Sequence, residues 1–476
     1  MTGRVAGRPR WWPMLALAAC ATAPPPTAAA DLDLELPARW AAAVDAAASA
    51  STGAWWSGFG DAQLDAVVDT ALRDNRDLRA ALARLEAAAA NRTIAGAAGL
   101  PELDASFDPV RARRLFLGFP FGGGGVPSST TTTYGLTLSL RWELDLWGRV
   151  RSGESAAIGD LQAAAADVAG ARTSLTAQVC KAWFATIAAD RQLELAEATV
   201  AAFRATADDV RDRYRRGMRP AIDVHQAAAN LANAEANVVQ RRDERQRARH
   251  RLDVLAGRVP GGRAGRAAPL PSTLPAVPAG LPSDLLQRRP DLVAAERRLA
   301  AAGCRIDAAK AALYPRLSLT ASGGTTSTDL EDLVDEDFRI WSLGANLLQP
   351  LFRGGALRAE VARATALRAE AMASYGGAVL RAFAEVEDAL ASEVLLAERL
   401  ATVTRAAEHA GKARDLARER WQLGLTDFLA VADGQRQTYL AEAARIDVER
   451  QRIDNRIDLF LALGGGFPAA ADGARP

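Results

Sequence analysis

Residues 419–436 read E-R-W-Q-L-G-L-T-D-F-L-A-V-A-D-G-Q-R, and within them a charged helical pattern breaks and restarts at once. Gly424 stands at the break, where glycine can adopt the left-handed turn that ends a helix without a Cβ penalty. Asp427 follows at a position where its carboxylate can cap the returning helix. The stretch therefore predicts a helical hairpin with a tight tip.

The same pattern occurs in the first half of the chain. Residues 213–227 read R-Y-R-R-G-M-R-P-A-I-D-V-H-Q-A, with Gly217 at the break and Pro220 where the first helical turn tolerates proline. One constant offset pairs Tyr214 with Trp421, Ile222 with Leu429, Val224 with Val431, Glu235 with Glu442, Leu252 with Leu459 and Gly257 with Gly464. The sequence is therefore predicted to be a tandem duplication with one hairpin in each copy.

The composition limits the class of fold and of function. The 476 residues are 6% aromatic and 24% charged, so long paired helices are favoured over thick layers. A net charge of +1 offers no concentrated basic face, which argues against nucleic-acid binding. His225, His250 and His409 share no metal-ligand spacing, and no catalytic triad or phosphate loop is present, so neither a metal, a cofactor nor an enzyme is predicted.

Apolar residues spaced by threes and fours predict helices over most of the chain. One helix is expected over residues 61–99, and its counterpart over 285–315. Longer helices are expected over residues 152–216 and 356–422, and the first of them is followed by a return helix over 220–256. At 1.5 Å per residue the long helices span on the order of 100 Å, which exceeds a bilayer, and their charged faces place them in water.

After Pro101 and Pro315 the apolar period changes from 3.6 to 2, which predicts two β-strands in each copy. The sharpest alternation sets Leu136, Leu138, Leu140, Trp142, Leu144 and Leu146 against Thr137, Ser139, Arg141, Glu143 and Asp145. Polar loops are expected at residues 122–133 and 323–337. A strand of about ten residues can cross a bilayer when tilted, with its apolar face in lipid and its polar face in a wet lumen. A soluble sandwich, with the charged face in bulk water, is the alternative.

Four strands in one chain cannot close into a barrel. An open edge in lipid would leave backbone donors and acceptors unpaired, which is costly. Two chains would give eight strands, whose interior is just filled by side chains. A conducting lumen therefore needs at least three subunits, and the expected fold is a membrane β-barrel joined to a long α-helical barrel.

The first 19 residues have the features of a lipoprotein signal peptide. Arginines precede an apolar run that is too short to span a membrane and ends L-A-A-C at Cys20, which resembles a lipobox. Cleavage before Cys20 and its acylation are expected; the alternative is a secretory signal cut near Ala30. The expected organisation is a signal peptide at 1–19, a tether and extended segment at 20–60, a first repeat at 61–256, a connector at 257–282, a second repeat at 283–464 and a flexible tail at 465–476.

The motifs in this order resemble those of TolC-like outer membrane factors, most closely the lipoprotein branch that serves drug-efflux pumps. They are the lipobox at Cys20, W-W-x-x-F-x-D at 55–61, L-D-L-W-G-R at 144–149, R-R-P-D at 288–291, Q-P-L-F-R-G-G at 349–355 and A-L-G-G-G at 462–466. The resemblance covers residues 20–466. It implies a homotrimer whose twelve strands form a barrel in outer membrane lipid, above a helical tunnel that crosses the periplasm.

The resemblance also implies partners and a cargo. The channel would dock onto a periplasmic adaptor protein and an inner-membrane efflux transporter, and would pass drugs or other small molecules outward. The breaks at Gly217 and Gly424 are the expected structural features of the tips that meet the adaptor.

The resemblance assigns a gate to the hairpin tips. Asp433 corresponds to an inward aspartate that forms a ring at the periplasmic end, and Asp223 to a carboxylate that holds a tyrosine of the neighbouring hairpin. Trp421 replaces that tyrosine, and its indole N–H can still donate a hydrogen bond. Arg436 belongs to the same predicted gate. A ring of carboxylates in a narrow lumen would favour cations over anions; the alternative is that both aspartates are merely solvated or capping.

Two other functions fit parts of the pattern. A duct for type I protein secretion would share the channel and differ in cargo. A periplasmic coiled-coil adaptor would share the long hairpins, but it normally carries one hairpin between β-rich modules. Two hairpins combined with membrane-type strands favour the efflux channel.

Overall fold

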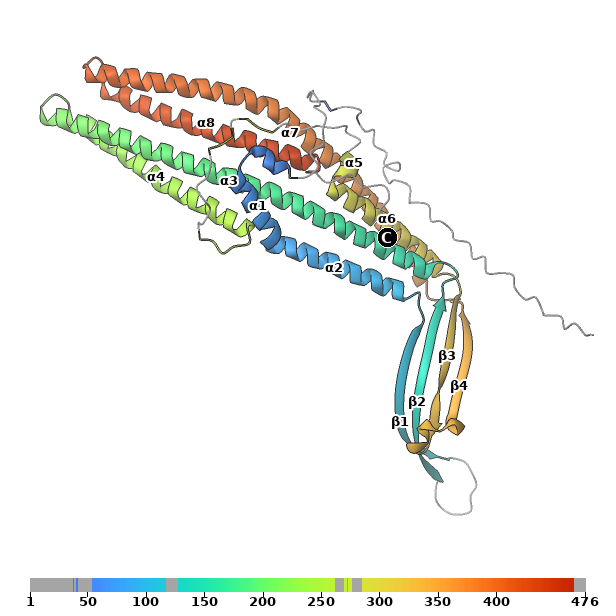
Figure 1. Cartoon of the computed structure of the whole chain (residues 1–476). Helices are drawn as coiled ribbons and strands as arrows, with labels where there is room; N and C mark the ends of the chain where they lie inside the picture. The colour runs from blue at the N-terminus through green and yellow to red at the C-terminus, as the bar shows by residue number, and fades with distance from the viewer. Residues whose placement is uncertain are drawn as a thin grey trace, which may run out of the picture.

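The structure, a computed structural model, describes residues 37, 40–41, 54–116, 127–261, 269–271, 273–275 and 285–465. Long helices lie side by side in an elongated bundle, and a four-stranded sheet extends at an angle from one end of it (Figure 1). The other end consists of two hairpin tips. The predicted signal peptide, Cys20, most of the tether, much of the connector and the tail from residue 466 lie outside the described residues.

The two halves of the chain repeat the same order of long elements. The first contains α1 (Ala62–Asp74), α2 (Arg76–Ala97), β1 (Glu102–Leu115), β2 (Ser128–Leu144), α3 (Arg149–Arg215) and α4 (Ala221–Leu255). The second contains α5 (Leu285–Arg288), α6 (Pro290–Ala311), β3 (Arg316–Ser327), β4 (Arg339–Leu348), α7 (Ala356–Gln422) and α8 (Phe428–Ala462). Helices α3 and α7 have 67 residues each, and α4 and α8 have 35 each. Equal lengths in the two halves are what a tandem duplication produces.

The prediction of one helix over residues 61–99 is wrong, because the helix breaks at Asn75. The backbone of Asn75 is extended (φ −61°, ψ 131°), and its side-chain oxygen accepts from the backbone N–H of Leu78 at 2.9 Å. Its amide nitrogen donates to the Leu255 carbonyl at 3.0 Å, across 180 residues of sequence. The end of α4 therefore holds the break between α1 and α2, which periodicity alone does not reveal.

Both hairpins end against the last residue of a shorter helix, Asp74 of α1 or Arg288 of α5, and each contact needs a glycine. Gly257, after α4, has φ 73°, and a Cβ on it would lie 2.4 Å from the Asp74 carbonyl oxygen. Gly464, after α8, has φ 94°, and a Cβ there would lie 2.5 Å from the Arg288 carbonyl oxygen. A left-handed backbone and a close approach coincide at both positions, so only glycine fits without strain.

The second copy strengthens this contact with a nearly buried arginine. The Arg289 guanidinium donates to Asp291 at 2.8 Å, to Glu385 of α7 at 2.6 Å and to the Ala462 carbonyl at 3.3 Å. Burial lowers the pKa of Arg289, but its two carboxylate partners outweigh burial and raise that pKa above its usual value. Arg289 therefore links the start of α6 and the end of α8 to the middle of α7.

The sheet is antiparallel throughout, in the order β1-β2-β3-β4. Its register places Phe107 beside Leu136 and Leu136 beside Thr325. Strand β2 begins at Ser128, so the loop predicted at residues 122–133 is wrong for 128–133, and β3 likewise runs into the second predicted loop. Residues 130–133 are threonines, whose branched side chains suit a strand although their polarity suggests a loop.

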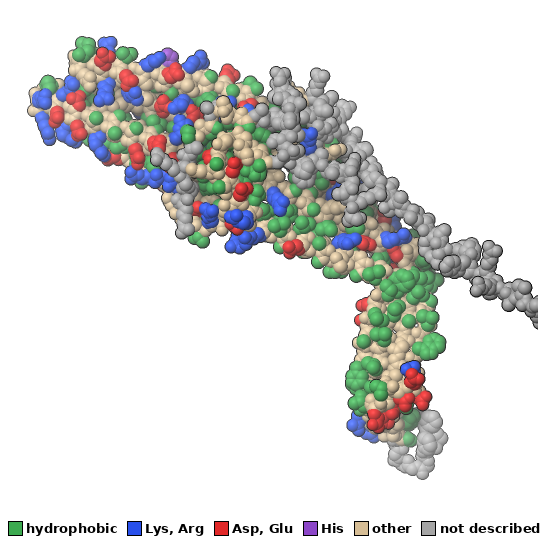
Figure 2. Space-filling model, in the orientation of Figure 1, with side chains coloured by type: hydrophobic (Ala, Val, Ile, Leu, Met, Phe, Trp, Pro, Cys, Tyr) green, Lys and Arg blue, Asp and Glu red, His purple; other side chains and the backbone are tan. Residues whose placement is uncertain are grey.

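One face of the sheet is apolar and exposed. Leu103, Phe107, Leu138, Trp341 and Leu343 share this face by the strand register, and their exposed fractions range from 49% to 82%. Figure 2 shows hydrophobic side chains over much of the visible sheet. The opposite face carries small and polar side chains, including Ser322 and Ser342, whose hydroxyls lie 2.7 Å apart. An exposed apolar face of this extent requires a covering partner or lipid.

The buried core lies where helices of both halves meet. Trp183 and Phe184 of α3 pack in it together with Leu64 of α1 and Ile457 of α8. Cys180 is buried in the same cluster and Cys304 is half-buried, and both are free thiols. In the part of the chain that the structure describes, no helix is both long and apolar enough to span a membrane.

The junctions between strands and long helices are fixed by polar contacts. Asp145 accepts from the backbone N–H groups of Val150 at 3.0 Å and Arg151 at 2.9 Å. Burial raises the pKa of Asp145, but these hydrogen bonds and the Arg151 charge outweigh burial and bring that pKa below its usual value. Trp147 donates to the Pro315 carbonyl at 2.8 Å, so the junctions of the two copies are also joined to each other.

Candidate functional site

The two hairpin tips have the same backbone geometry. Gly217 has φ 73° and Gly424 has φ 72°, as their predicted role as helix breaks requires. In the first tip the N–H of Met218 donates to the Arg213 carbonyl at 2.9 Å, and in the second the N–H of Leu425 donates to the Arg420 carbonyl at 2.8 Å. These bonds form the Schellman motif that ends a helix with a left-handed glycine.

Trp421 joins the second hairpin to the first. It lies in the last turn of α7 and is 2% exposed, and its indole nitrogen donates to Asp209 of α3 at 2.8 Å. The guanidinium carbons of Arg213 and Arg219 lie 4.9 and 4.1 Å from the ring centroid. Arg213 also donates to Asp209 at 3.1 Å. The buried ring contacts two cations and its N–H reaches a carboxylate, so cation–π and hydrogen-bond contacts occur at one place.

Within one chain, Trp421 contacts Asp209 rather than Asp223, and a contact of Asp223 with a neighbouring hairpin stays a prediction. Asp223 lies at the start of α4 and is half-buried. Among the described residues, its side chain has no hydrogen bond or ion pair, and the tryptophan contacts Asp209 instead. Asp209 is one helical turn before Arg213 on α3, and this places its carboxylate beside the last turn of α7.

An apolar cluster supports the Trp421 contact. It contains seven buried residues from α3, α4, α7 and α8: Ala207, Val210, Ala227, Trp421, Phe428, Val431 and Ala432. The Trp421 and Phe428 ring centroids are 6.1 Å apart, with planes at 65°. Because all four helices contribute, the two tips of the chain are packed as a single unit.

Asp433 and Arg436, which the sequence placed in the gate, form an ion pair with each other. The Arg436 guanidinium lies 2.6 Å from the Asp433 carboxylate, and both side chains are more than half exposed. An arginine one turn away therefore offsets part of the Asp433 charge within the chain.

The ion pair lines a groove of about 430 Å³ between α3, α4 and α8. Asn230, Asn233 and Asn237 line the groove from α4, and Tyr439 lines it from α8. The Asn237 amide donates to the Tyr439 hydroxyl at 2.6 Å. This hydrogen bond is a polar bridge between two helices that are otherwise separated by the groove.

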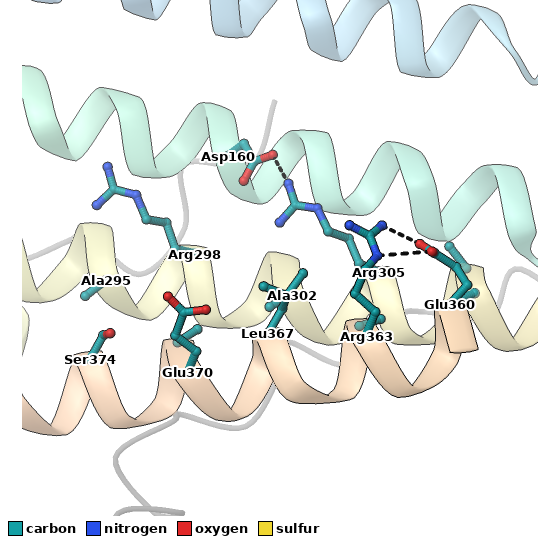
Figure 3. Close-up of a pocket in the computed structure, with 14 residues that line it drawn as sticks. Asp160, Ala295, Arg298, Ala302, Arg305, Glu360, Arg363, Leu367, Glu370 and Ser374 are labelled. Carbon is teal, nitrogen blue, oxygen red and sulfur yellow. Dashed lines mark hydrogen bonds and ion pairs between the residues drawn. The ribbon is translucent and has the colours of Figure 1, made fainter. Parts of the chain in front are cut away.

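A larger groove, of about 780 Å³, lies nearer the sheet, and Figure 3 shows its residues on α3, α6 and α7. Six alanines are among the residues that line it. Three arginines line it, and each is paired with a carboxylate: Arg298 with Asp167, Arg305 with Asp160, and Arg363 with Glu360. The pairs of Arg298 and Arg305 join α6 to α3, whereas the pair of Arg363 with Glu360 lies within α7.

Sequence reasoning missed Asp209, Arg213 and Arg219. Asp209 and Arg213 are four residues apart on a helix, which is a signal for an ion pair but not for a tryptophan site. The contact to Trp421 spans 212 residues of sequence. Among the residues that the structure describes, no group of three His, Cys, Asp or Glu is arranged to hold a metal ion.

Comparison with known proteins gives matches along nearly the whole chain. A family described as "Outer membrane efflux protein" matches residues 67–258 and 281–465. Outer membrane protein OprJ of Pseudomonas aeruginosa is 35% identical over 459 residues, 95% of this chain and 94% of OprJ. The pyoverdine export outer membrane protein OpmQ of the same species is 32% identical over 463 residues, 96% of each chain. The solved structure of the outer-membrane channel OprN is 32% identical and has a TM-score of 0.82, covering 92% of this chain and 99% of OprN.

Proposed function

Because the chain belongs to the outer membrane efflux protein family, we propose that three copies assemble into one duct with a twelve-stranded barrel and a continuous helical tunnel. Members of this family are channels rather than enzymes, and this chain is an outer membrane efflux channel that extends into the periplasm. The trimer, its partners, its gate and its cargo are the parts of the proposal.

The observation that carries the trimer is the open sheet. Strands β1 and β4 are its two edges, and the apolar face is exposed. In lipid, an unpaired edge leaves backbone groups without partners, so β4 of one copy must pair with β1 of the next. A closed ring of two copies would have eight strands and a lumen filled by side chains. Three copies are the smallest ring that conducts.

The helical wall supports the same closure. Near the sheet, the helices of one chain pack in the order α2, α3, α6 and α7, so α2 and α7 are the two edges of the helical wall. Both edges carry exposed alanines at heptad-like spacing: Ala80, Ala83, Ala87 and Ala90 on α2, and Ala359, Ala362, Ala366, Ala369 and Ala373 on α7. Small side chains let two helices approach closely, so α2 of one copy fits against α7 of the next.

The hairpins supply the periplasmic part of the duct. A helix of 67 residues is on the order of 100 Å long, enough to extend from the outer membrane far into the periplasm. The tips at Gly217 and Gly424 would meet a periplasmic adaptor, and the adaptor would connect the duct to an inner-membrane efflux transporter. The name of OpmQ includes pyoverdine export, and for this chain we propose small organic molecules as the cargo.

The gate is proposed at the tips. Three copies of the Asp433–Arg436 pair would face one narrow lumen, and the Trp421 contact with Asp209 would keep the two tips of each copy together. Asp223, which has no side-chain partner among the described residues, is left for a contact between copies. Each of these residues would act by electrostatics and packing, without a metal or cofactor.

Lipid on Cys20 is the proposed membrane anchor. It would hold the N-terminus at the inner surface of the outer membrane. Mass spectrometry of the purified protein should show a lipid mass on the N-terminal peptide that Cys20→Ala removes, while the variant still forms the channel. A wild-type N-terminus without lipid would contradict the anchor.

Conductance tests the channel itself. Purified protein reconstituted into a planar bilayer should produce ion-conducting steps, and expression in a strain that lacks its own efflux duct should restore resistance to a toxic small molecule. Protein that enters the bilayer without conducting would contradict the proposal. Resistance that stays unrestored while a secreted protein appears outside the cell would favour type I secretion.

A further inference from the structure

Two segments of opposite charge lie at the end of the sheet that is farthest from the helices. The basic segment consists of Arg111, Arg113 and Arg114 near the end of β1, and we call it the arginine rim. The acidic turn joins β3 to β4, and its carboxylates are Asp329, Glu331, Asp332, Asp335, Glu336 and Asp337. Figure 2 shows acidic side chains gathered at this end of the sheet and basic ones at its other edge.

We propose that the arginine rim of one copy binds the acidic turn of the next copy, as a charged clasp at the outer end of the barrel. This inference rests on the trimer proposed above and names the contact that selects and holds the neighbouring copy. It goes beyond strand pairing, because backbone hydrogen bonds alone do not specify which edge pairs with which.

The arginine rim has no acidic partner in its own copy. All three arginines are exposed, and Arg113 donates to the Ser128 hydroxyl at 3.1 Å. Within the described residues, none of the three forms an ion pair with a carboxylate. The sequence between Asp108 and Glu143 has no acidic residue, so the whole β1–β2 hairpin beyond Asp108 is cationic at its outer end.

The acidic turn has a defined shape. It contains the short 310 helices η4 (Glu331–Val334) and η5 (Glu336–Phe338). The Ser327 hydroxyl donates to Asp332 at 2.7 Å, and the Thr325 hydroxyl donates to the Leu333 carbonyl at 2.8 Å. Arg339, the first residue of β4, pairs with Glu336 at 2.6 Å and places one positive charge beside the acidic turn. Six carboxylates near one arginine repel each other, so an isolated copy holds an uncompensated negative charge here.

The sheet topology keeps the two segments apart within a copy and brings them together between copies. β1 and β4 are opposite edges, with β2 and β3 between them, so they lie about 14 Å apart at a strand spacing of about 4.8 Å. When the ring closes, β4 of one copy lies about 4.8 Å from β1 of the next. β1 runs outward and ends in the arginine rim, whereas β4 starts at the acidic turn and runs inward, so the antiparallel order continues across the contact (Figure 1).

Charge complementarity across such a contact acts on specificity. Opposite charges on neighbouring strands stabilise the pair, and like charges destabilise it. A pairing of β1 with β1 would set two arginine rims side by side, and a pairing of β4 with β4 would set two acidic turns side by side. The charges therefore favour the head-to-tail ring and disfavour symmetric dimers.

Phosphate groups of the outer leaflet are another anionic partner for the arginines. They leave the acidic turn unexplained, because its carboxylates would repel the same phosphates. A second copy of the chain accounts for both segments at once, and it is the partner that the charges favour.

Charge reversal with exchange tests the clasp. Three variants are needed: R111E/R113E/R114E, D335K/E336K/D337K and the combination of both. The readout is the temperature at which the detergent-solubilised trimer dissociates to monomer on a mild gel. Each triple should lower that temperature by several degrees, and the combination should recover most of the loss, because the opposite charges are restored with exchanged sides. The dissociation temperature of the wild type should also fall as ionic strength rises.

Controls separate the clasp from general effects of charge. R251E/R258E reverses two exposed arginines on the helical part of the chain, and it should leave the dissociation temperature unchanged. The neutral variant R111Q/R113Q/R114Q should give a smaller shift than the reversal, and it keeps the test open if the reversed chain does not reach the membrane.

Several outcomes would overturn the clasp. The proposal fails if neither triple variant shifts the dissociation temperature. It also fails if the combined variant lowers that temperature by as much as the two triple variants do together. An unrescued loss in the arginine triple, together with loss of co-purifying phosphorylated glycolipid, assigns the arginines to lipid. A wild-type protein that runs only as a monomer contradicts the trimer itself, which distinguishes failure of the proposed function from failure of the clasp.

Discussion

Asp209 shows, at the scale of single residues, what one sequence can and cannot reveal. Local rules predicted Gly217 and Gly424 as breaks and Asp427 as a cap, and the structure has a left-handed backbone at both glycines and a hydrogen bond from the Ala430 N–H to Asp427 at 3.1 Å. Tertiary packing determines which residue Trp421 contacts, so local sequence rules could not predict Asp209 as its partner. The duplication does not help either, since its counterpart Tyr214 is 46% exposed and Trp421 is 2% exposed.

The Trp421 contact gives a first prediction. Trp421→Phe keeps an aromatic ring beside Arg213 and Arg219 but removes the N–H that reaches Asp209. We expect the free energy of unfolding to fall by about 1 kcal/mol, as for one lost hydrogen bond, and the closed-state conductance to rise several-fold. Tyr214→Phe is the matched control at the corresponding position of the first repeat, and it should change neither quantity. A Trp421→Phe channel as tight and as stable as the wild type would show that the contact does not hold the tips.

The Asp433–Arg436 pair gives a second prediction, in which two variants differ in sign. Asp433→Ala leaves Arg436 unpaired, so the channel should become leakier and less sensitive to block by divalent cations. Arg436→Ala leaves the carboxylate uncompensated, so divalent block should strengthen. Conductance of the purified channel with and without a divalent cation measures both. Equal block in the two variants and the wild type would remove this pair from the gate.

At the scale of elements, periodicity predicted types better than boundaries. The helix expected over residues 356–422 has the bounds of α7. The alternating segments are strands, but the prediction of loops at their polar, threonine-rich ends is wrong. The threonines at residues 130–133 lie beyond the leucine-rich part of the sheet, so their side chains are polar. Their backbone is nevertheless a strand, because it pairs with Arg111 and its neighbours on β1. The break at Asn75 was missed for a related reason, because the end of α4 stabilises it.

The glycine after each hairpin gives a third prediction. Gly257→Ala places a methyl group against the Asp74 carbonyl and also forces a left-handed backbone, which alone costs about 1–2 kcal/mol. Gly217→Ala is the matched control, because its φ is also 73° but no atom lies within 4 Å of the added Cβ. Thermal unfolding followed by helical circular dichroism should show a clearly larger loss of stability for Gly257→Ala. Equal losses in the two variants would mean that the close approach to the end of α1 does not matter.

At the scale of the whole molecule, each chain has unpaired edges in both its sheet and its helical wall. The sheet ends in unpaired β1 and β4, the helical wall ends in alanine-lined α2 and α7, and the outer end carries opposite charges on opposite edges. Four strands per chain and the need for closure were predictable from the sequence, because period and length are local properties. The charged clasp was not, since it requires knowing which strands are the edges.

The number of copies in the assembled channel tests this account most directly. Native mass spectrometry of the protein released from detergent micelles measures it without assuming a structure. The account predicts a single assembly with three times the mass of the processed chain. An assembly of two chains, or a monomer that stays in solution without detergent, would contradict the closed twelve-stranded barrel and the duct built on it.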